Sequence, residues 1–113
     1  MGKAFIAEMG KRIQERRKAL RLSQEELAER SEITKQTVSR AENGQRELGA
    51  GNVMKIAQAL EVSTDYLLTG EYTSADVQIL NQKVTNLTNG QYEFLEDFVK
   101  KFIEICDEFY IGR

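Results

Sequence analysis

The chain has 113 residues, of which 41% are hydrophobic, with no Pro, one Cys, no His and a formal net charge of -2 at pH 7. These values favour one helical domain with an extension, and they argue against a zinc or iron site, an internal disulfide and a membrane-spanning helix. We therefore expect an all-α, cytoplasmic protein that is not an enzyme and needs no metal, cofactor or small-molecule ligand.

The first predicted helix runs from about Ala4 to Leu20. Its apolar residues recur at helical spacing and are expected to face inward, whereas Lys11, Arg12, Arg16 and Lys18 are expected to face outward. Residues 1–46 carry 11 Lys and Arg against 7 Asp and Glu, and residues 47–113 carry 5 against 11. The first part of the chain is therefore where phosphate groups could bind.

Two short helices follow, joined by a tight turn. Ser23 and Glu26 have the spacing of a capping box, which predicts a helix from Ser23 to about Arg30. Thr34 is a second candidate N-cap and Gly44 a candidate helix stop, so the next helix runs from Thr34 to Asn43. Two short helices in this order are typical of a helix-turn-helix unit.

Two further helices complete the predicted domain, at about Asn52 to Leu60 and from Ser63 to Gly70. The compact helix-turn-helix domain is therefore expected to comprise residues 1–70, and residues 71–113 form a helical extension. In that extension a capping box at Thr73 and Asp76 begins one helix. A second box at Thr88 and Gln91 begins another, which runs to about Tyr110.

Four segments resemble the xenobiotic-response-element family of phage-repressor and Cro-type domains. They are LSQEELAE from Leu22, ITKQTVSRAENG from Ile33, IAQAL from Ile56 and VSTDYLLTG from Val62. The resemblance covers roughly Met9 to Gly70 and implies a five-helix, lambda-repressor-like DNA-binding domain. It further implies a bacterial or phage-encoded repressor that binds double-stranded DNA as a dimer, at an operator with two-fold related half-sites. When bound to DNA, such a repressor is associated with the nucleoid.

The family's recognition helix corresponds to Lys35 to Asn43. Gln36 and Arg40 are four residues apart and share a helix face, as do Lys35 and Ser39. Gln suits an adenine edge and Arg a guanine edge, so Gln36 and Arg40 are the main expected base contacts. Lys35 and Ser39 are expected to contact bases from the same side of the helix, and Thr37 from its edge. The resemblance assigns a DNA phosphate contact to Gln24, and helix-end positions suggest further backbone contacts by Thr34, Asn43, Gln45 and Arg46.

Arg17 and Glu42 match a pair that the family buries as a structural ion pair, so Glu42 is not expected to contact DNA. Glu32 and Glu61 stand where the family often has Gly. A left-handed backbone costs a residue other than Gly about 1 kcal/mol or more, so the resemblance predicts a slightly different turn at Glu32.

The extension carries more apolar residues than a single contact with its own domain requires. We predict that it pairs two copies in a homodimer through the segment Val77 to Tyr110, and further assembly into tetramers stays open. The expected dimer contacts are Val77, Leu80, Val84, Leu87, Leu95, Phe98, Val99, Phe102, Cys106 and Phe109. Two alternatives are that the extension folds back on its own domain, or that it binds a different protein, as in an antitoxin-like interaction module.

Overall fold

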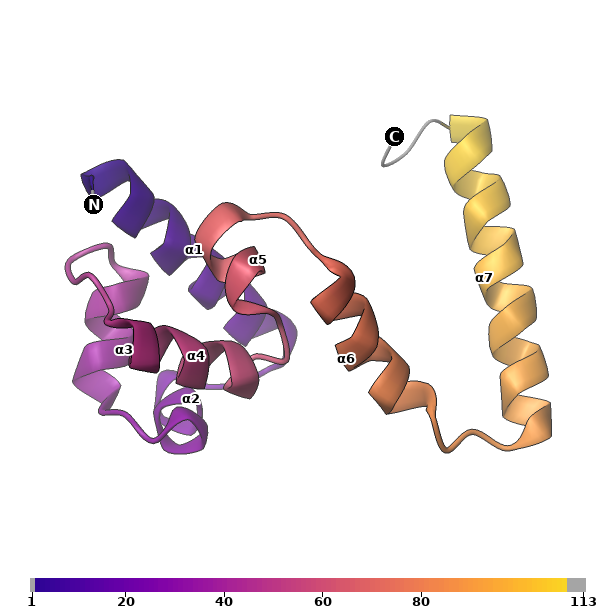
Figure 1. Cartoon of the computed structure of the whole chain (residues 1–113), viewed down its shortest axis with the longest axis horizontal. Coiled ribbons are helices and arrows are strands. Elements are labelled where there is room, and N and C mark those ends of the chain that lie inside the picture. Colours follow the sequence, from indigo (N-terminus) through magenta and orange to yellow (C-terminus); the bar gives the residue numbers. More distant parts are fainter. Residues whose placement is uncertain (1, 110–113) are drawn as a thin grey trace. The chain divides into compact units, whose positions relative to one another are not determined.

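The computed structural model describes residues 2–109, and these residues contain seven α-helices and no β-strand (Figure 1). The helices are α1 (Lys3–Ala19), α2 (Gln24–Ser31), α3 (Lys35–Glu42), α4 (Ala50–Ala59), α5 (Thr64–Thr69), α6 (Ser74–Val84) and α7 (Asn89–Phe109). The predicted all-α class is confirmed. Tyr110, the predicted end of the last helix, lies outside the described residues.

The chain divides into two compact units, Met1–Leu80 and Asn81–Arg113. The first contains α1 to α5 and continues past Gly70 into α6. The second contains the end of α6 and all of α7. The boundary that the sequence places at Gly70 stays a prediction.

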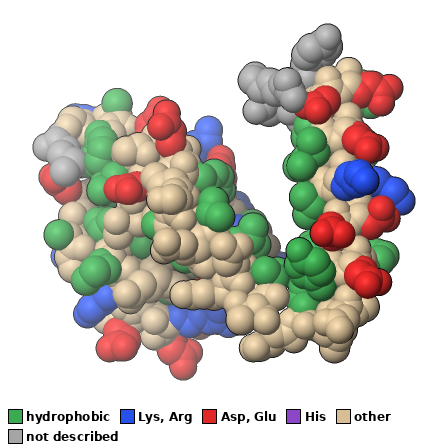
Figure 2. All heavy atoms as spheres, turned by 45° about the vertical axis from the view of Figure 1, so that its right-hand side comes forward, with side chains coloured by type: hydrophobic (Ala, Val, Ile, Leu, Met, Phe, Trp, Pro, Cys, Tyr) green, Lys and Arg blue, Asp and Glu red, His purple; other side chains and the backbone are tan. Residues whose placement is uncertain are grey.

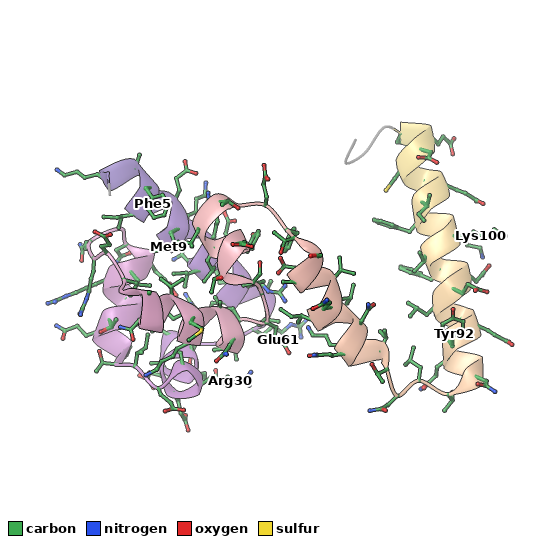
Figure 3. All side chains as sticks on the ribbon, in the orientation of Figure 1. Phe5, Met9, Arg30, Glu61, Tyr92 and Lys100 are labelled. Carbon is green, nitrogen blue, oxygen red and sulfur yellow. The ribbon has the colours of Figure 1, made fainter. Side chains whose placement is uncertain are left out.

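Helices α1 to α5 enclose one hydrophobic core. Ile13, Leu27, Val38, Ile56, Leu60 and Leu67 have no exposed surface. Met9 joins them from α1 and is 2% exposed (Figure 3). Because each of the five helices contributes to this core, the positions of α2 and α3 are fixed by packing on α1 and α4.

Local capping signals set the helix starts. The Ser23 hydroxyl accepts from the Glu26 N–H at 3.0 Å, and the Glu26 carboxylate accepts from the Ser23 N–H at 3.0 Å. Thr88 and Gln91 make the same reciprocal pair before α7. The N–H and hydroxyl of Ser23 stabilise the Glu26 carboxylate and lower its pKa. These starts lie where the sequence predicts them, because a capping box needs only nearby residues.

The turns that follow α2 and α4 keep a left-handed backbone without Gly. Glu32 has φ 56° and ψ 40°, and Glu61 has φ 59°. Arg21, after α1, has φ 59° as well. The prediction of a different turn at Glu32 is therefore wrong, and the chain accepts the local strain because core packing holds α2 and α3 on either side.

Gly10 sets how closely α3 approaches α1. A Cβ atom at Gly10 would lie 2.1 Å from the carbonyl oxygen of Ala41. The absence of a side chain therefore lets the backbones of the two helices meet.

After α3, Gly44 has φ 69°, and the N–H groups of Gly44 and Gln45 donate to the carbonyls of Ala41 and Arg40. This pattern ends the helix where the sequence predicts.

Two basic residues of α1 lie inward, in contrast to the prediction. Arg12 donates to the carbonyl oxygen of Leu67 at 2.9 Å, and Arg16 donates to the carbonyl oxygen of Leu60 at 2.9 Å. Both bonds are partly buried, and each satisfies a carbonyl at the end of α4 or α5. Arg12 and Arg16 are therefore structural, because helix ends leave carbonyls that need donors.

The side chains of α6 and α7 stand in contrast to the core: none of those described in the two helices is buried. The α6 helix ends at Val84, so Leu87 lies between α6 and α7, and its dimer contact stays a prediction. In α7, Phe94 is 75% exposed and Phe98 is 60% exposed. This large apolar surface is uncovered in the single chain.

Candidate nucleic-acid interface

The helix-turn-helix unit is formed by α2, the turn at residues 32–34 and α3. Thr34 caps α3 by accepting from the N–H of Thr37 at 3.1 Å. Val38 and Ala41 lie in the core at 0% and 1% exposure. One face of α3 is thus fixed inward, and the opposite face is presented to solvent.

The exposed face of α3 carries most of the predicted base contacts. Lys35, Gln36 and Arg40 are exposed, and Ser39 is partly exposed. Gln36 and Arg40 lie one helical turn apart on this face. Arg40 offers two donors that suit the two acceptors of a guanine edge, and Gln36 offers one donor and one acceptor that suit an adenine edge.

Thr37 differs from the other predicted base contacts because it is buried. It is 8% exposed, and its hydroxyl lies 2.8 Å from that of Thr34. Arg46 donates to the same Thr37 oxygen at 3.3 Å. Thr37 therefore holds the start of α3 and orients Arg46, and its hydroxyl is already engaged within the protein.

The predicted ion pair between Arg17 and Glu42 is present and buried. The Nε and Nη2 atoms of Arg17 donate to the two carboxylate oxygens of Glu42 at 2.7 and 3.0 Å. A third Arg17 nitrogen donates to the carbonyl of Leu22 at 2.8 Å. This two-point pairing joins α1 to the last turn of α3 and fixes the rotation of the helix.

Gln24 is a member of the same network, which the sequence did not predict. Its Nε2 atom donates to Glu42 at 3.1 Å, and the side chain stays partly exposed. The phosphate contact of Gln24 stays a prediction. The bond does show that the start of α2 and the end of α3 are joined through one carboxylate.

Lys35 pairs with Glu25 across the two helices of the unit. The Lys35 ammonium lies 3.1 Å from the Glu25 carboxylate, and both side chains are more than half exposed. An exposed pair of this kind contributes about 0–1 kcal/mol to stability. The pair joins the first residue of α3 to the first turn of α2.

The remaining predicted backbone contacts surround the exposed face of α3. Thr34 stands at its start, and Asn43, Gln45 and Arg46 stand at or beyond its end, all of them exposed. The structure therefore brings together a central polar face and two flanking groups of hydrogen-bond donors. This arrangement can meet base edges and neighbouring phosphates at once.

Residues 2–109 contain no cluster of three His, Cys, Asp or Glu side chains placed to hold a metal ion. None of the helices described is both long and apolar enough to cross a membrane.

A helix-turn-helix family model matches residues 13–67. The HTH-type transcriptional regulator YqaE of Bacillus subtilis, itself uncharacterized, is 31% identical over 97 residues, which cover 81% of this chain and 84% of that protein. The chain spans 49% to 67% of the length of other curated relatives it matches.

Two solved structures share the fold of the first unit. The restriction-modification controller protein C.AhdI from Aeromonas hydrophila is 38% identical with a TM-score of 0.55, over 57% of this chain and 97% of that one. The c2 repressor of phage P22, solved in complex with a synthetic operator, is 35% identical with a TM-score of 0.54. That match covers 56% of this chain and 96% of the repressor chain.

Proposed function

The chain belongs to the phage-repressor class of helix-turn-helix transcriptional regulators, and from this membership we propose that it represses transcription by binding a palindromic operator as a homodimer. The observation that carries the proposal is the exposed polar face of α3. That face is held in one orientation by the core on its opposite side and by the buried pair of Arg17 and Glu42.

In this proposal Gln36 and Arg40 read the bases. Arg40 binds a guanine edge and Gln36 an adenine edge, and each two-point contact discriminates against a wrong base by about 1–3 kcal/mol. Lys35 and Ser39 contact neighbouring bases. Thr37, which the sequence suggested as a further base contact, instead positions Thr34 and Arg46.

The DNA backbone is bound by the side chains around α3. Arg46 and the polar groups of Thr34, Asn43 and Gln45 contact phosphates and fix the register of α3 in the groove. Gln24 contributes from the start of α2, while its bond to Glu42 keeps it in place. The c2 repressor of phage P22, which has the same fold, was solved on an operator, and this supports DNA as the partner.

The homodimer is formed through α6 and α7. Successive residues of a helix are rotated by about 100°, which places the apolar and the charged side chains of α7 on opposite halves of its surface. Figure 2 shows this separation along α7, and Lys100 lies on the charged side (Figure 3). The apolar half consists of Tyr92, Phe94, Leu95, Phe98, Val99, Phe102, Ile103, Ile105, Cys106 and Phe109.

An apolar face that occupies half of a helix is wider than the two-position seam of a simple coiled-coil pair. A second copy supplies an α6 and an α7 of its own, and so offers more than one helix to cover it. Because a two-fold axis also pairs the DNA-binding units, the same symmetry suits a palindromic operator.

The test is a selection of binding sites from a library of random duplexes, with the wild type and two double variants. One variant is Gln36→Ala/Arg40→Ala. The matched control, Lys55→Ala/Gln58→Ala, removes the same positive charge and amide from the exposed surface of α4. Wild type and control should select one palindrome, whereas the α3 variant should keep only weak, salt-sensitive binding.

The outcomes separate the parts of the proposal. If the α3 variant selects the wild-type palindrome, Gln36 and Arg40 do not read the bases. If the wild type selects no site, the operator-binding function is wrong, and the antitoxin-like alternative, in which the extension binds a different protein, takes its place.

A further inference from the structure

The carboxylate of Asp76 connects the start of α6 to the start of α5 through hydrogen bonds. Asp76 accepts hydrogen bonds from the N–H and the hydroxyl of Ser63 at 2.7 and 2.6 Å, and from the N–H of Thr73 at 2.9 Å. Ser63 is 8% exposed, and its hydroxyl also accepts from the N–H of Tyr66 to cap α5. The starts of α5 and α6 therefore share one hydrogen-bond network.

A ring contact supports the same connection. Tyr72 stacks on Tyr66, with 4.3 Å between the ring centres and 10° between the ring planes. Tyr66 packs on the core, so the segment between Gly70 and α6 is held at Tyr72 as well as at Asp76. A flexible linker has neither partly buried hydrogen bonds to a core element nor a stacked ring, so this segment is a fixed joint.

We propose that Asp76 is a positioning residue that sets the spacing between the two operator half-sites. The inference rests on the proposed function, because it requires a homodimer on a palindrome. Val77 and Leu80, the first residues of the proposed dimer seam, follow Asp76 within about one helical turn. By fixing the direction of the first turns of α6, Asp76 fixes the positions of Val77 and Leu80 relative to α3 of the same chain.

The consequence is geometric. Adding one base pair between two half-sites moves them about 3.4 Å apart and rotates one relative to the other by about 34°. A dimer with a fixed joint cannot follow this change and loses simultaneous binding of both half-sites. With a loose joint, the two DNA-binding domains of the dimer change their relative positions. The dimer then keeps most of the affinity that it gains from binding both half-sites at once.

The first experiment measures affinity for operators whose selected spacing is lengthened or shortened by one base pair. Wild type should prefer its own spacing by about 100-fold, and Asp76→Ala or Tyr72→Ala should reduce this ratio to below about tenfold. Affinity for a single half-site should not change, which a merely structural role of Asp76 would not predict. The matched control is Asp65→Ala, an exposed carboxylate in the first turn of α5. If Asp76→Ala keeps the wild-type ratio, the spacing role is overturned.

A second experiment needs no DNA. Spin labels at Lys55→Cys and Gln78→Cys, in a Cys106→Ser chain diluted with unlabelled chain, report the distance between α4 and α6 within one copy. Wild type should give one narrow distance distribution and Asp76→Ala a broad one. Equal widths would overturn the fixed joint whatever the DNA result. A narrow wild-type distribution with no selected palindrome would instead overturn the proposed function, and the spacing role with it.

Discussion

The two compact units differ in what covers their apolar side chains. In the first unit the core residues of α1 to α5 are covered by one another, and several have no exposed surface at all. In the second unit α7 has half of its surface apolar, and none of its described side chains is buried. The first unit therefore contains what it needs to fold, whereas α7 needs a partner surface.

The largest expected effect concerns the pair that orients α3. Arg17→Met leaves the Glu42 carboxylate buried with Gln24 as its remaining side-chain donor. We expect a loss of about 3–5 kcal/mol in the free energy of unfolding, because an unpaired buried charge is costly. Urea unfolding followed by circular dichroism measures it. The control, Arg17→Met/Glu42→Leu, should recover much of the loss, and a single variant as stable as wild type would contradict the assigned role.

The second prediction tests the uncovered face of α7. Phe102→Glu places a charge in the apolar half, and Lys100→Glu places the same residue in the charged half of the same helix. We expect Phe102→Glu to weaken the homodimer by about 2–4 kcal/mol and Lys100→Glu to leave it nearly unchanged. Sedimentation equilibrium gives both dissociation constants. Equal dimer strength in the two variants would show that the apolar half is not the interface.

The third prediction concerns the close approach of α1 and α3. Gly10→Ala inserts a methyl group against the carbonyl of Ala41, so the two helices must separate. We expect a loss of about 1–3 kcal/mol in stability, even though Ala favours a helix more than Gly does. Gly51→Ala, in α4, is the control because a Cβ atom there meets nothing within 4 Å. Thermal unfolding of both variants measures the change in stability. A Gly10→Ala variant more stable than wild type would refute the close approach of α1 and α3 at this position.

The smallest expected effect is the pH dependence at the start of α6. Partial burial raises the pKa of Asp76, but the hydrogen bonds from Ser63 and Thr73 outweigh it, and the net pKa lies below the ordinary value of 3.8. A carboxylate with a lowered pKa adds stability above its unfolded-state value and loses it as the pH falls through the folded-state value. Wild type should exceed Asp76→Asn in stability by about 1 kcal/mol at neutral pH.

That difference should shrink as the pH falls from about 5 to about 2, because Asp76 then becomes protonated. Thermal unfolding of both proteins across this range measures the change. A difference that stays constant with pH would mean that the charge on Asp76 does not stabilise the joint.

The sequence predicted the features that depend on neighbouring residues. The helix starts at Ser23, Thr34, Ser63 and Thr88 follow from caps that act within three residues. The pairing of Arg17 with Glu42 came from the family resemblance, and the structure contains it.

The features that the sequence did not predict join residues far apart in the chain. Arg12 and Arg16 were expected in solvent, yet they bind carbonyls of Leu67 and Leu60. Helical periodicity places these arginines beside the core-facing residues but does not indicate which carbonyls lie opposite. The sequence does not predict the contact between Ser63 and Asp76 for the same reason, since the spacing of each residue indicates only the start of its own helix.

We propose that α3 in the first unit reads DNA and that α6 and α7 pair two copies. The most direct measurement is sedimentation of the full chain on a duplex with the selected palindrome and on one with a scrambled half-site. We predict two protomers bound together on the palindrome, and much weaker binding on the scrambled duplex. Binding of one protomer at a time, with equal affinity on both duplexes, would contradict the account.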